Sequence, residues 1–291
     1  MVFNRGFYPA LGTPLDKDGN LIENSYIKQI ELMIGANAQG VLCMGSMGTE
    51  QALTTKNYRK TAEVASKTVN KRVPLLIGAM DNSVFRVKER IDALEGIDYD
   101  GIVLTTPFYH MDSFKDLVNY FNEIANYSKK PLYLYDLPGV TKQKITFALV
   151  KEIAKNKNIK GIKSGDPVLG RLIKLHLPEI DFFFSNLDIF DMGISFGVDK
   201  VLDGMFTCMP KTSKAFANAI ESGDSAKITE ELNKIIALRD QFLKNGIWPG
   251  YTIAMNLIGC DGNYGPGYQK EAPLPNEYEE VKAFMEKIGE I

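Results

Sequence analysis

Lys163 and Tyr135 are the residues of this chain whose types and positions suggest chemistry. Lys163 stands at the end of the short apolar run 159–163, just before a turn, and Tyr135 lies 28 residues earlier, near the end of the run 131–138. A lysine amine can condense with a ketone to form an imine, and a neighbouring phenol can carry protons. Most lysines are solvated surface charges, but burial at a strand end favours the neutral, nucleophilic amine. The pair therefore indicates imine chemistry on a ketone.

The elements that position these two residues are predicted from alternating apolar and amphipathic segments. Nearly continuous apolar runs such as 73–78 are typical of parallel strands covered on both faces. Eight such strands, most followed by helical sequence, predict a closed (β/α)₈ barrel. We expect the strands at residues 7–15, 40–47, 73–80, 101–109, 131–138, 159–164, 181–186 and 200–205.

Helix-period segments occupy the connections and the end of the chain. We expect helices at 24–36, from 54 onward, at 114–127 and at 146–154, and later at 214–222, 225–245, 249–258 and 276–288. Roughly 85 residues follow the last strand, more than one barrel helix needs. The predicted domains are a catalytic barrel at 1–224 and a C-terminal helical extension at 225–291. An open doubly wound sheet is disfavoured, because the loop Gly45–Glu50 fits no phosphate-binding fingerprint.

Composition limits the functions of this chain. Its 291 residues carry a net charge of −2, which gives no reason to expect nucleic acid or anionic membrane as a partner. No apolar stretch is long enough to span a membrane, and the N-terminal residues 1–6 show no secretory signal. The three cysteines have no metal-ligand spacing. These features predict a soluble, cytoplasmic protein with reduced thiols.

Other catalytic classes lack their residues. The chain has two histidines, His110 and His176, far apart in sequence, which disfavours a zinc-dependent aldolase. We expect His176 to be structural, at a helix end. No G-x-S-x-G elbow indicates a serine triad. Polar residues do stand at the predicted carboxyl ends of strands, where barrel enzymes place their sites, Asp203 among them.

Four segments in register resemble the N-acetylneuraminate lyase and dihydrodipicolinate synthase superfamily of class I pyruvate-dependent aldolases. Gly45-Ser46-Met47-Gly48-Thr49-Glu50 is similar to the G-[ST]-T-G-E loop of that family. Thr106-Pro107-Phe108-Tyr109 resembles T-P-[FY]-Y, Tyr135-Asp136-Leu137-Pro138 resembles Y-N-x-P, and Gly161-Ile162-Lys163 resembles G-[IL]-K. Their order and separations agree, so the resemblance covers essentially the whole chain.

The resemblance implies a (β/α)₈ barrel with a C-terminal helical extension, usually a homotetramer, acting on pyruvate or another 2-oxo acid. It implies that Lys163 forms the imine and that Tyr135 shuttles protons in a hydroxyl relay with Ser46 and Tyr109, Tyr109 reaching across a subunit interface. Backbone N–H groups of Ser46 and Met47 would hold the substrate carboxylate. The covalent imine replaces a cofactor, and no metal is required.

Some residues depart from the family pattern near the expected imine. Met47 replaces a hydroxyl residue, Thr49 stands where glutamate is usual, and the segment after Lys163 is short. Asp136 replaces an asparagine, and we interpret it as structural.

Other departures concern the second substrate. Val140 replaces the arginine by which dihydrodipicolinate synthases bind a second carboxylate. Asp188 retains one member of the Asp-Glu pair that binds sugar hydroxyls in neuraminate lyases, and Asp203 adds a polar group. We expect Asp188 and Asp203 to bind substrate, although either could cap a helix or loop.

The main hypothesis is an aldolase (lyase) that cleaves or forms a 2-oxo-3-deoxy sugar acid with pyruvate as one fragment. A sugar-acid dehydratase that uses the same imine is an alternative. Dihydrodipicolinate synthase is disfavoured by Val140. A catalytically inactive 2-oxo acid binder is the remaining possibility, since folds outlive functions. The aldehyde partner cannot be read from the sequence.

Overall fold

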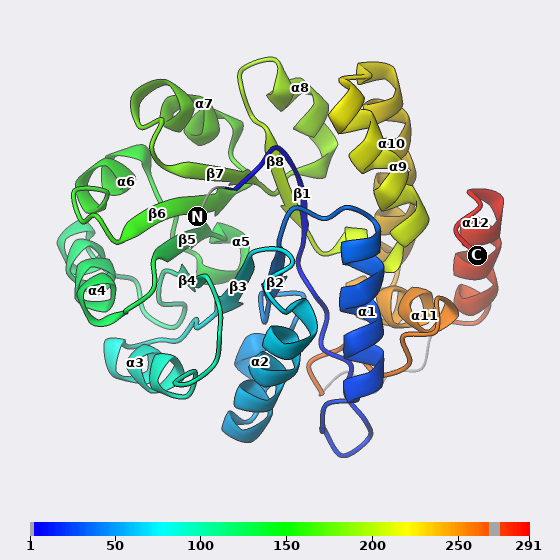
Figure 1. Cartoon of the computed structure of the whole chain (residues 1–291), viewed down its shortest axis with the longest axis horizontal. Helices are drawn as coiled ribbons and strands as arrows, with labels where there is room; N and C mark the ends of the chain where they lie inside the picture. The colour runs from blue at the N-terminus through cyan, green and yellow to red at the C-terminus, as the bar shows by residue number, and fades with distance from the viewer. Residues whose placement is uncertain (1–2, 268–273) are drawn as a thin grey trace.

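The computed structural model describes residues 3–267 and 274–291, so Met1 and Val2 of the N-terminal segment lie outside it. Eight parallel strands run in the order β1-β8-β7-β6-β5-β4-β3-β2. A bridge between Ala10 and Leu42 joins the two ends of this sheet, so the strands enclose a barrel (Figure 1). The strands are β1 (Gly6–Pro9), β2 (Val41–Cys43), β3 (Leu75–Gly78), β4 (Gly101–Thr105), β5 (Leu132–Asp136), β6 (Ile159–Ser164), β7 (Asp181–Phe184) and β8 (Lys200–Asp203).

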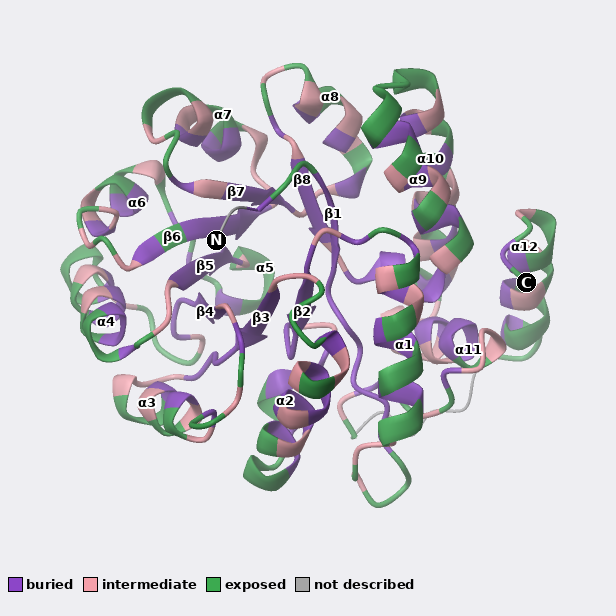
Figure 2. Cartoon of the chain, in the orientation of Figure 1, coloured by how far each residue is buried: buried purple, intermediate pink, exposed green. Residues whose placement is uncertain are grey.

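The strands are largely buried on both faces, as the apolar runs predict, with Lys160 of β6 as an exposed exception (Figure 2). Side chains alternate between the barrel interior and the layer beneath the helices. Leu132 and Leu134 of β5 belong to the outer core, whereas Tyr133 and Tyr135 belong to the interior cluster. This alternation directs Tyr135 toward the inside of the barrel.

Helices follow the strands and cover the outside of the barrel, with their buried faces turned inward (Figure 2). Local capping defines several starts: Thr54 accepts a hydrogen bond from Asn57 N–H, and Ser113 forms a capping box with Asp116. The α-helices of this layer are α1 (Glu23–Gly35), α2 (Thr55–Val69), α3 (Val84–Asp92), α4 (Phe114–Tyr127), α5 (Pro138–Thr141), α6 (Phe147–Ile153), α7 (Pro167–His176), α8 (Phe190–Ile194) and α9 (Pro210–Ser222). Short 3₁₀ turns are η1 (Glu50–Ala52), η2 (Leu187–Ile189) and η3 (Met205–Cys208).

Three further helices form the expected C-terminal extension beside the barrel (Figure 1). They are α10 (Ser225–Leu243), α11 (Ile247–Leu257) and α12 (Glu277–Lys287). Ile228 and Leu232 of α10 share one hydrophobic core with Phe216 and Ile220 of α9. The core is thus continuous across residue 225, and the division into two domains stays a prediction.

The barrel fold and all eight strands are confirmed, but most strands are shorter than expected. The predicted strand 40–47, for example, ends at Cys43, and its remaining residues form a loop. The polar residues of interest lie at or just beyond the carboxyl ends of the strands. His176 is the last residue of α7, as predicted. Within the part of the chain that the structure describes, no helix is long and apolar enough to cross a membrane.

Candidate active site

Lys163 and Tyr135 are direct neighbours at the carboxyl end of the barrel. They are register partners on the paired strands β6 and β5. The Nζ atom of Lys163 lies 4.1 Å from the centroid of the Tyr135 ring. Both residues are buried, with 7% of Lys163 and 5% of Tyr135 exposed. The structure therefore brings the proposed amine and phenol together in a largely dry environment.

Aromatic rings fill the barrel interior next to this pair. Phe183 of β7 is the register partner of Lys163, and its ring packs edge-on against Tyr8 with centroids 5.0 Å apart. Phe3, from the segment before β1, packs against Phe183 and Tyr133 at 5.1 and 5.4 Å. Burial raises the pKa values of Tyr8 and Tyr133, so both phenols stay neutral. This packing keeps water away from the inner side of the amine.

The loop that begins at Gly45 is held from several sides. Thr13 donates its hydroxyl to the carbonyl of Gly48 over 2.7 Å, and Thr49 N–H donates to the carbonyl of Ser46 over 3.1 Å. Thr49 adopts a left-handed conformation with φ of 47°. These contacts fix the backbone around Ser46 and Met47, which the resemblance assigns to carboxylate binding.

Met47 crosses from this loop to the end of β8. A β-carbon built on Gly204 would lie 2.7 Å from the Met47 side chain, which is closer than real atoms approach. The residue after Asp203 is therefore glycine because Met47 occupies the space of its side chain. Met47 is partly buried and packs against the interior cluster that contains Tyr135.

Asp136 braces the ends of β5 and β6, in line with its structural interpretation. Its carboxylate accepts hydrogen bonds from the hydroxyl of Ser164 at 2.8 Å and from Ile145 N–H at 2.9 Å, and Lys144 Nζ lies 3.3 Å away. Asp136 and Ser164 directly follow Tyr135 and Lys163, so the brace holds the two strand ends in register.

Tyr109 lies apart from this pair in the single chain. It is 81% exposed, and its ring packs edge-on against His110 with centroids 4.8 Å apart. Within residues 3–267 and 274–291, no hydrogen bond joins the hydroxyl groups of Ser46, Tyr135 and Tyr109. The hydroxyl relay across a subunit interface stays a prediction.

Asp188 and Asp203 have different partners near β7 and β8. The carboxylate of Asp188 pairs with both terminal nitrogens of Arg239 from α10, each at 2.8 Å. These hydrogen bonds hold the pKa of Asp188 below its ordinary value. Asp203 accepts a hydrogen bond from Met205 N–H at 2.9 Å, and burial raises its pKa. Among the described residues, Asp203 is thus hydrogen-bonded by backbone N–H groups, whereas both oxygens of Asp188 pair with the Arg239 side chain.

Several residues near the carboxyl end of the barrel could not be identified from the sequence. Arg239 lies in a long amphipathic helix far from every motif, and nothing local marks it as a partner of Asp188. The same holds for Arg90 of α3, which contacts Glu50 at 3.0 Å. Val140, in place of an arginine, lies on α5 and is 61% exposed. Only the packing of the barrel brings these side chains to its carboxyl end.

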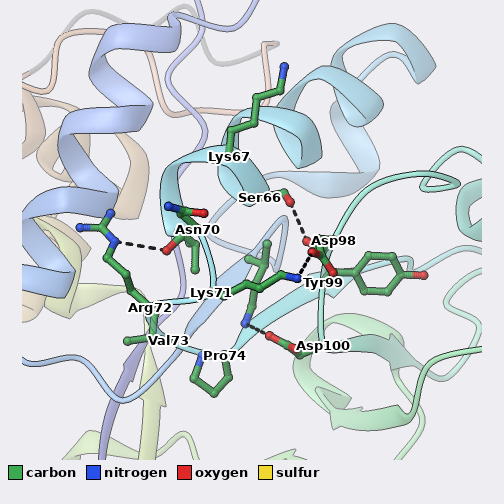
Figure 3. A pocket seen from close by; sticks show the side chains of 12 residues that line it. Ser66, Lys67, Asn70, Lys71, Arg72, Val73, Pro74, Asp98, Tyr99 and Asp100 are labelled. Atoms are coloured by element: carbon green, nitrogen blue, oxygen red, sulfur yellow. Dashed lines mark hydrogen bonds and ion pairs between the residues drawn. The ribbon is translucent and has the colours of Figure 1, made fainter.

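A hollow of about 550 Å³ lies at the other end of the barrel, where β3 and β4 begin (Figure 3). Two of its charged groups pair with each other, Lys71 with Asp98 at 2.7 Å, and Asp100 accepts a hydrogen bond from Leu75 N–H at 2.8 Å. This hollow is remote from Lys163 and contains no group placed for imine chemistry. No cluster of three or more potential metal-ligating side chains occurs among the described residues.

An eight-stranded barrel with a buried lysine and tyrosine at its carboxyl end has the architecture of imine-forming aldolases. The model of the dihydrodipicolinate synthetase family matches residues 4–286. A 4-hydroxy-tetrahydrodipicolinate synthase from Methanococcus maripaludis strain C5 is 30% identical over 260 residues, covering 88% of this chain and 89% of the relative. The chain therefore belongs to the dihydrodipicolinate synthetase family, as the motifs predict.

Solved structures agree with the fold. A dihydrodipicolinic acid synthase family protein from E. coli K12, solved in complex with pyruvate, has a TM-score of 0.90 at 23% identity over the full length of both chains. The N-acetylneuraminate lyase of Proteus mirabilis has a TM-score of 0.88 at 19% identity, also over both full lengths. Enzymes of this family are pyruvate-dependent and of the aldolase type, and they form an imine on a lysine without a metal.

Proposed function

We propose that this protein is a class I aldolase that cleaves or forms a 2-oxo-3-deoxy sugar acid, with pyruvate as one fragment. The contact between Lys163 and Tyr135 carries this proposal, because it sets an amine beside a phenol in a buried pocket. Membership of a pyruvate-dependent family supports the 2-oxo acid half of the substrate. We propose further that the chain works as a cytoplasmic homotetramer in which Tyr109 completes the neighbouring site.

The reaction begins when the Lys163 amine adds to C2 of the 2-oxo acid and water leaves, which gives a protonated imine. This imine accepts the electron pair released when the C3–C4 bond breaks. Tyr135, in the predicted relay with Ser46 and Tyr109, takes the proton of the C4 hydroxyl as the aldehyde departs. The resulting enamine takes a proton at C3, and water then hydrolyses the imine to release pyruvate.

Backbone N–H groups of Ser46 and Met47 hold the carboxylate of the 2-oxo acid in this proposal. The hydrogen bonds around Gly48 and Thr49 support it, because they fix that loop before substrate arrives. Fixed backbone donors also introduce no competing nucleophile. The carboxylate of Asp203 would accept a hydrogen bond from a substrate hydroxyl. Asp188 would bind the substrate while its carboxylate remains paired with Arg239.

A 4-hydroxy-tetrahydrodipicolinate synthase is the second candidate. The sequence disfavours it through Val140, but the comparisons do not support that exclusion, since the curated relative at 30% identity bears this name. Both candidates share the imine of Lys163 with pyruvate and differ in the aldehyde. A dehydratase would release water from an intact carbon skeleton, and an inactive binder would hold pyruvate without turnover.

The test is reduction with borohydride in the presence of pyruvate, followed by peptide mass spectrometry. We expect an adduct on Lys163 and none in Lys163→Met. Lys160, which is exposed on the same strand, offers a matched control, because Lys160→Met should keep the adduct. Pyruvate release from a panel of 2-oxo-3-deoxy acids, beside turnover with aspartate semialdehyde, then separates the candidates. A folded protein without an adduct on Lys163 contradicts the proposal.

A further inference from the structure

A chain of buried and half-buried polar contacts connects two loops of the proposed site. The carboxylate of Glu50 is fully buried, and Nη1 of Arg90 lies 3.0 Å from its Oε1. Nε of the same guanidinium donates to Oδ2 of Asp81 over 3.1 Å. Oδ1 of Asp81 accepts from Asn82 N–H, and Oδ1 of Asn82 accepts from Phe108 N–H over 2.9 Å. Every link is a direct contact.

The ends of this chain lie next to the proposed catalytic groups. Glu50 follows the loop that carries Ser46 and Met47, and Phe108 directly precedes Tyr109. The turn at 46–49 and Phe108 lie outside the strands and helices, so strand pairing does not position either loop. The hydrogen bonds of Thr13 and Thr49 hold the first loop, and the contacts of Arg90 link it to the second.

Arg90 is the residue that spans the two halves. It comes from α3, its side chain is 13% exposed, and its guanidinium carbon lies 5.1 Å from the centroid of the Tyr58 ring. Tyr58 in turn donates its hydroxyl to the carbonyl of Gly78 at the end of β3. A planar guanidinium presents several donors in a rigid fork, so it can contact Glu50 and Asp81 at once. A lysine ammonium in the same place is a single point charge.

We propose that Arg90 is a positioning residue, which holds the Ser46–Met47 loop and the Phe108–Tyr109 loop at a fixed distance through Glu50, Asp81 and Asn82. The inference rests on the proposed function, because it concerns the same site. This role would explain why the carboxylate of Glu50 and the guanidinium of Arg90 are paired beneath the loops. Breaking the link displaces groups that must meet the imine within a fraction of an ångström.

Pyruvate alone suffices for the test. The pyruvate concentration that gives half-maximal borohydride trapping on Lys163 reports on the carboxylate loop. The exchange of pyruvate methyl protons for deuterium, followed by NMR, reports on proton transfer. We expect Arg90→Lys to raise the half-saturating concentration and to lower the exchange rate, each about tenfold. Asn82→Ala, which removes only the acceptor for Phe108 N–H, should slow exchange and leave half-saturation unchanged.

Arg72→Lys is the matched control. Arg72 pairs with Glu31 far from the carboxyl ends of the strands, and its substitution should alter neither readout. If Arg90→Lys lowers the melting temperature but leaves half-saturation and exchange as in the wild type, the role of Arg90 is structural only and the inference is wrong. Unchanged exchange in Asn82→Ala overturns the link to Tyr109. A wild-type protein that traps no pyruvate refutes the proposed function instead, so the two failures are distinguishable.

Discussion

The amine of Lys163 faces the ring of Tyr135 across the β5–β6 pair, with Nζ 4.1 Å from the ring centroid. Strand pairing imposes this relationship, because register partners on adjacent parallel strands direct their side chains to the same face. The brace of Asp136 and Ser164 fixes the same register one residue further along. The proposed chemistry and the local stability of the site therefore depend on the same two strand ends.

Tyr135→Phe should separate proton transfer from imine formation. The substitution keeps the ring beside Lys163 but removes the hydroxyl, so pyruvate trapping should persist. Deuterium exchange at the pyruvate methyl group should fall about 10²-fold or more, the scale of general acid–base catalysis. NMR measures the exchange. Tyr133→Phe, one layer deeper on the same face, is the control, and an equal loss there would argue against a specific role for Tyr135.

Gly204→Ala should destabilise the protein through Met47. Its new β-carbon would lie 2.7 Å from the Met47 side chain, so the free energy of unfolding should fall by about 1–3 kcal/mol, the usual cost of overpacking. Met47→Ala in the same chain should recover most of that loss. Urea unfolding of both single variants and the double variant measures the coupling. Additive effects would mean that the two residues do not compete for space.

The pair of Asp188 and Arg239 should give a small, pH-dependent contribution. Arg239 lowers the folded-state pKa of Asp188, so the pair stabilises the fold above the unfolded aspartate pKa of about 3.9. That contribution is lost as the pH falls through the folded-state pKa. Because Asp188 is largely exposed, Arg239→Met should cost only about 0.5 kcal/mol at pH 7. In urea titrations the difference should shrink as the pH is lowered toward 3. A pH-independent difference, or one that persists in an Asp188→Asn background, would assign the effect to packing.

Asp136 should tolerate an amide but not truncation. Asp136→Asn keeps an oxygen that can accept from Ile145 N–H or Ser164, and asparagine is the residue that the family motif carries here. Asp136→Ala leaves both buried donors without this partner. The free energy of unfolding should fall by at most about 1–3 kcal/mol for each donor. Thermal unfolding with pyruvate trapping on Lys163 compares the two. Equal stability of both variants would show that the brace contributes little.

Val140→Arg should reveal how the second substrate is recognised. Val140 is exposed on α5, so an arginine has room there and could form a forked contact with a carboxylate. We expect the variant to increase turnover with pyruvate and aspartate semialdehyde, and to leave pyruvate trapping unchanged. Coupled absorbance assays on both proteins provide the comparison. Efficient synthase turnover by the wild type would show that Val140 does not exclude this substrate.

Local patterns in the sequence predict the barrel and the neighbourhood of Lys163 and Tyr135. Apolar runs covered on both faces and helix-period segments each reflect local burial, and the strand-end positions follow from the chain order of the elements. Strand lengths are less well predicted, because a run such as 40–47 stays buried at Met44 and Gly45 after it leaves the sheet at Cys43. Burial alone does not distinguish a strand from a packed loop.

The sequence by itself determined the fold and the family, and it predicts Lys163 as the reacting amine. Only the tertiary structure decided which side chains contact it and one another. Arg239 meets Asp188, Arg90 links Glu50 to Asp81, and Met47 occupies the space beside Gly204. Apart from the contact of Arg90 with Asp81, these contacts join residues between 40 and 157 positions apart, and no local pattern encodes them. Their geometry arises when closure of the barrel brings the loops of non-adjacent segments over one end.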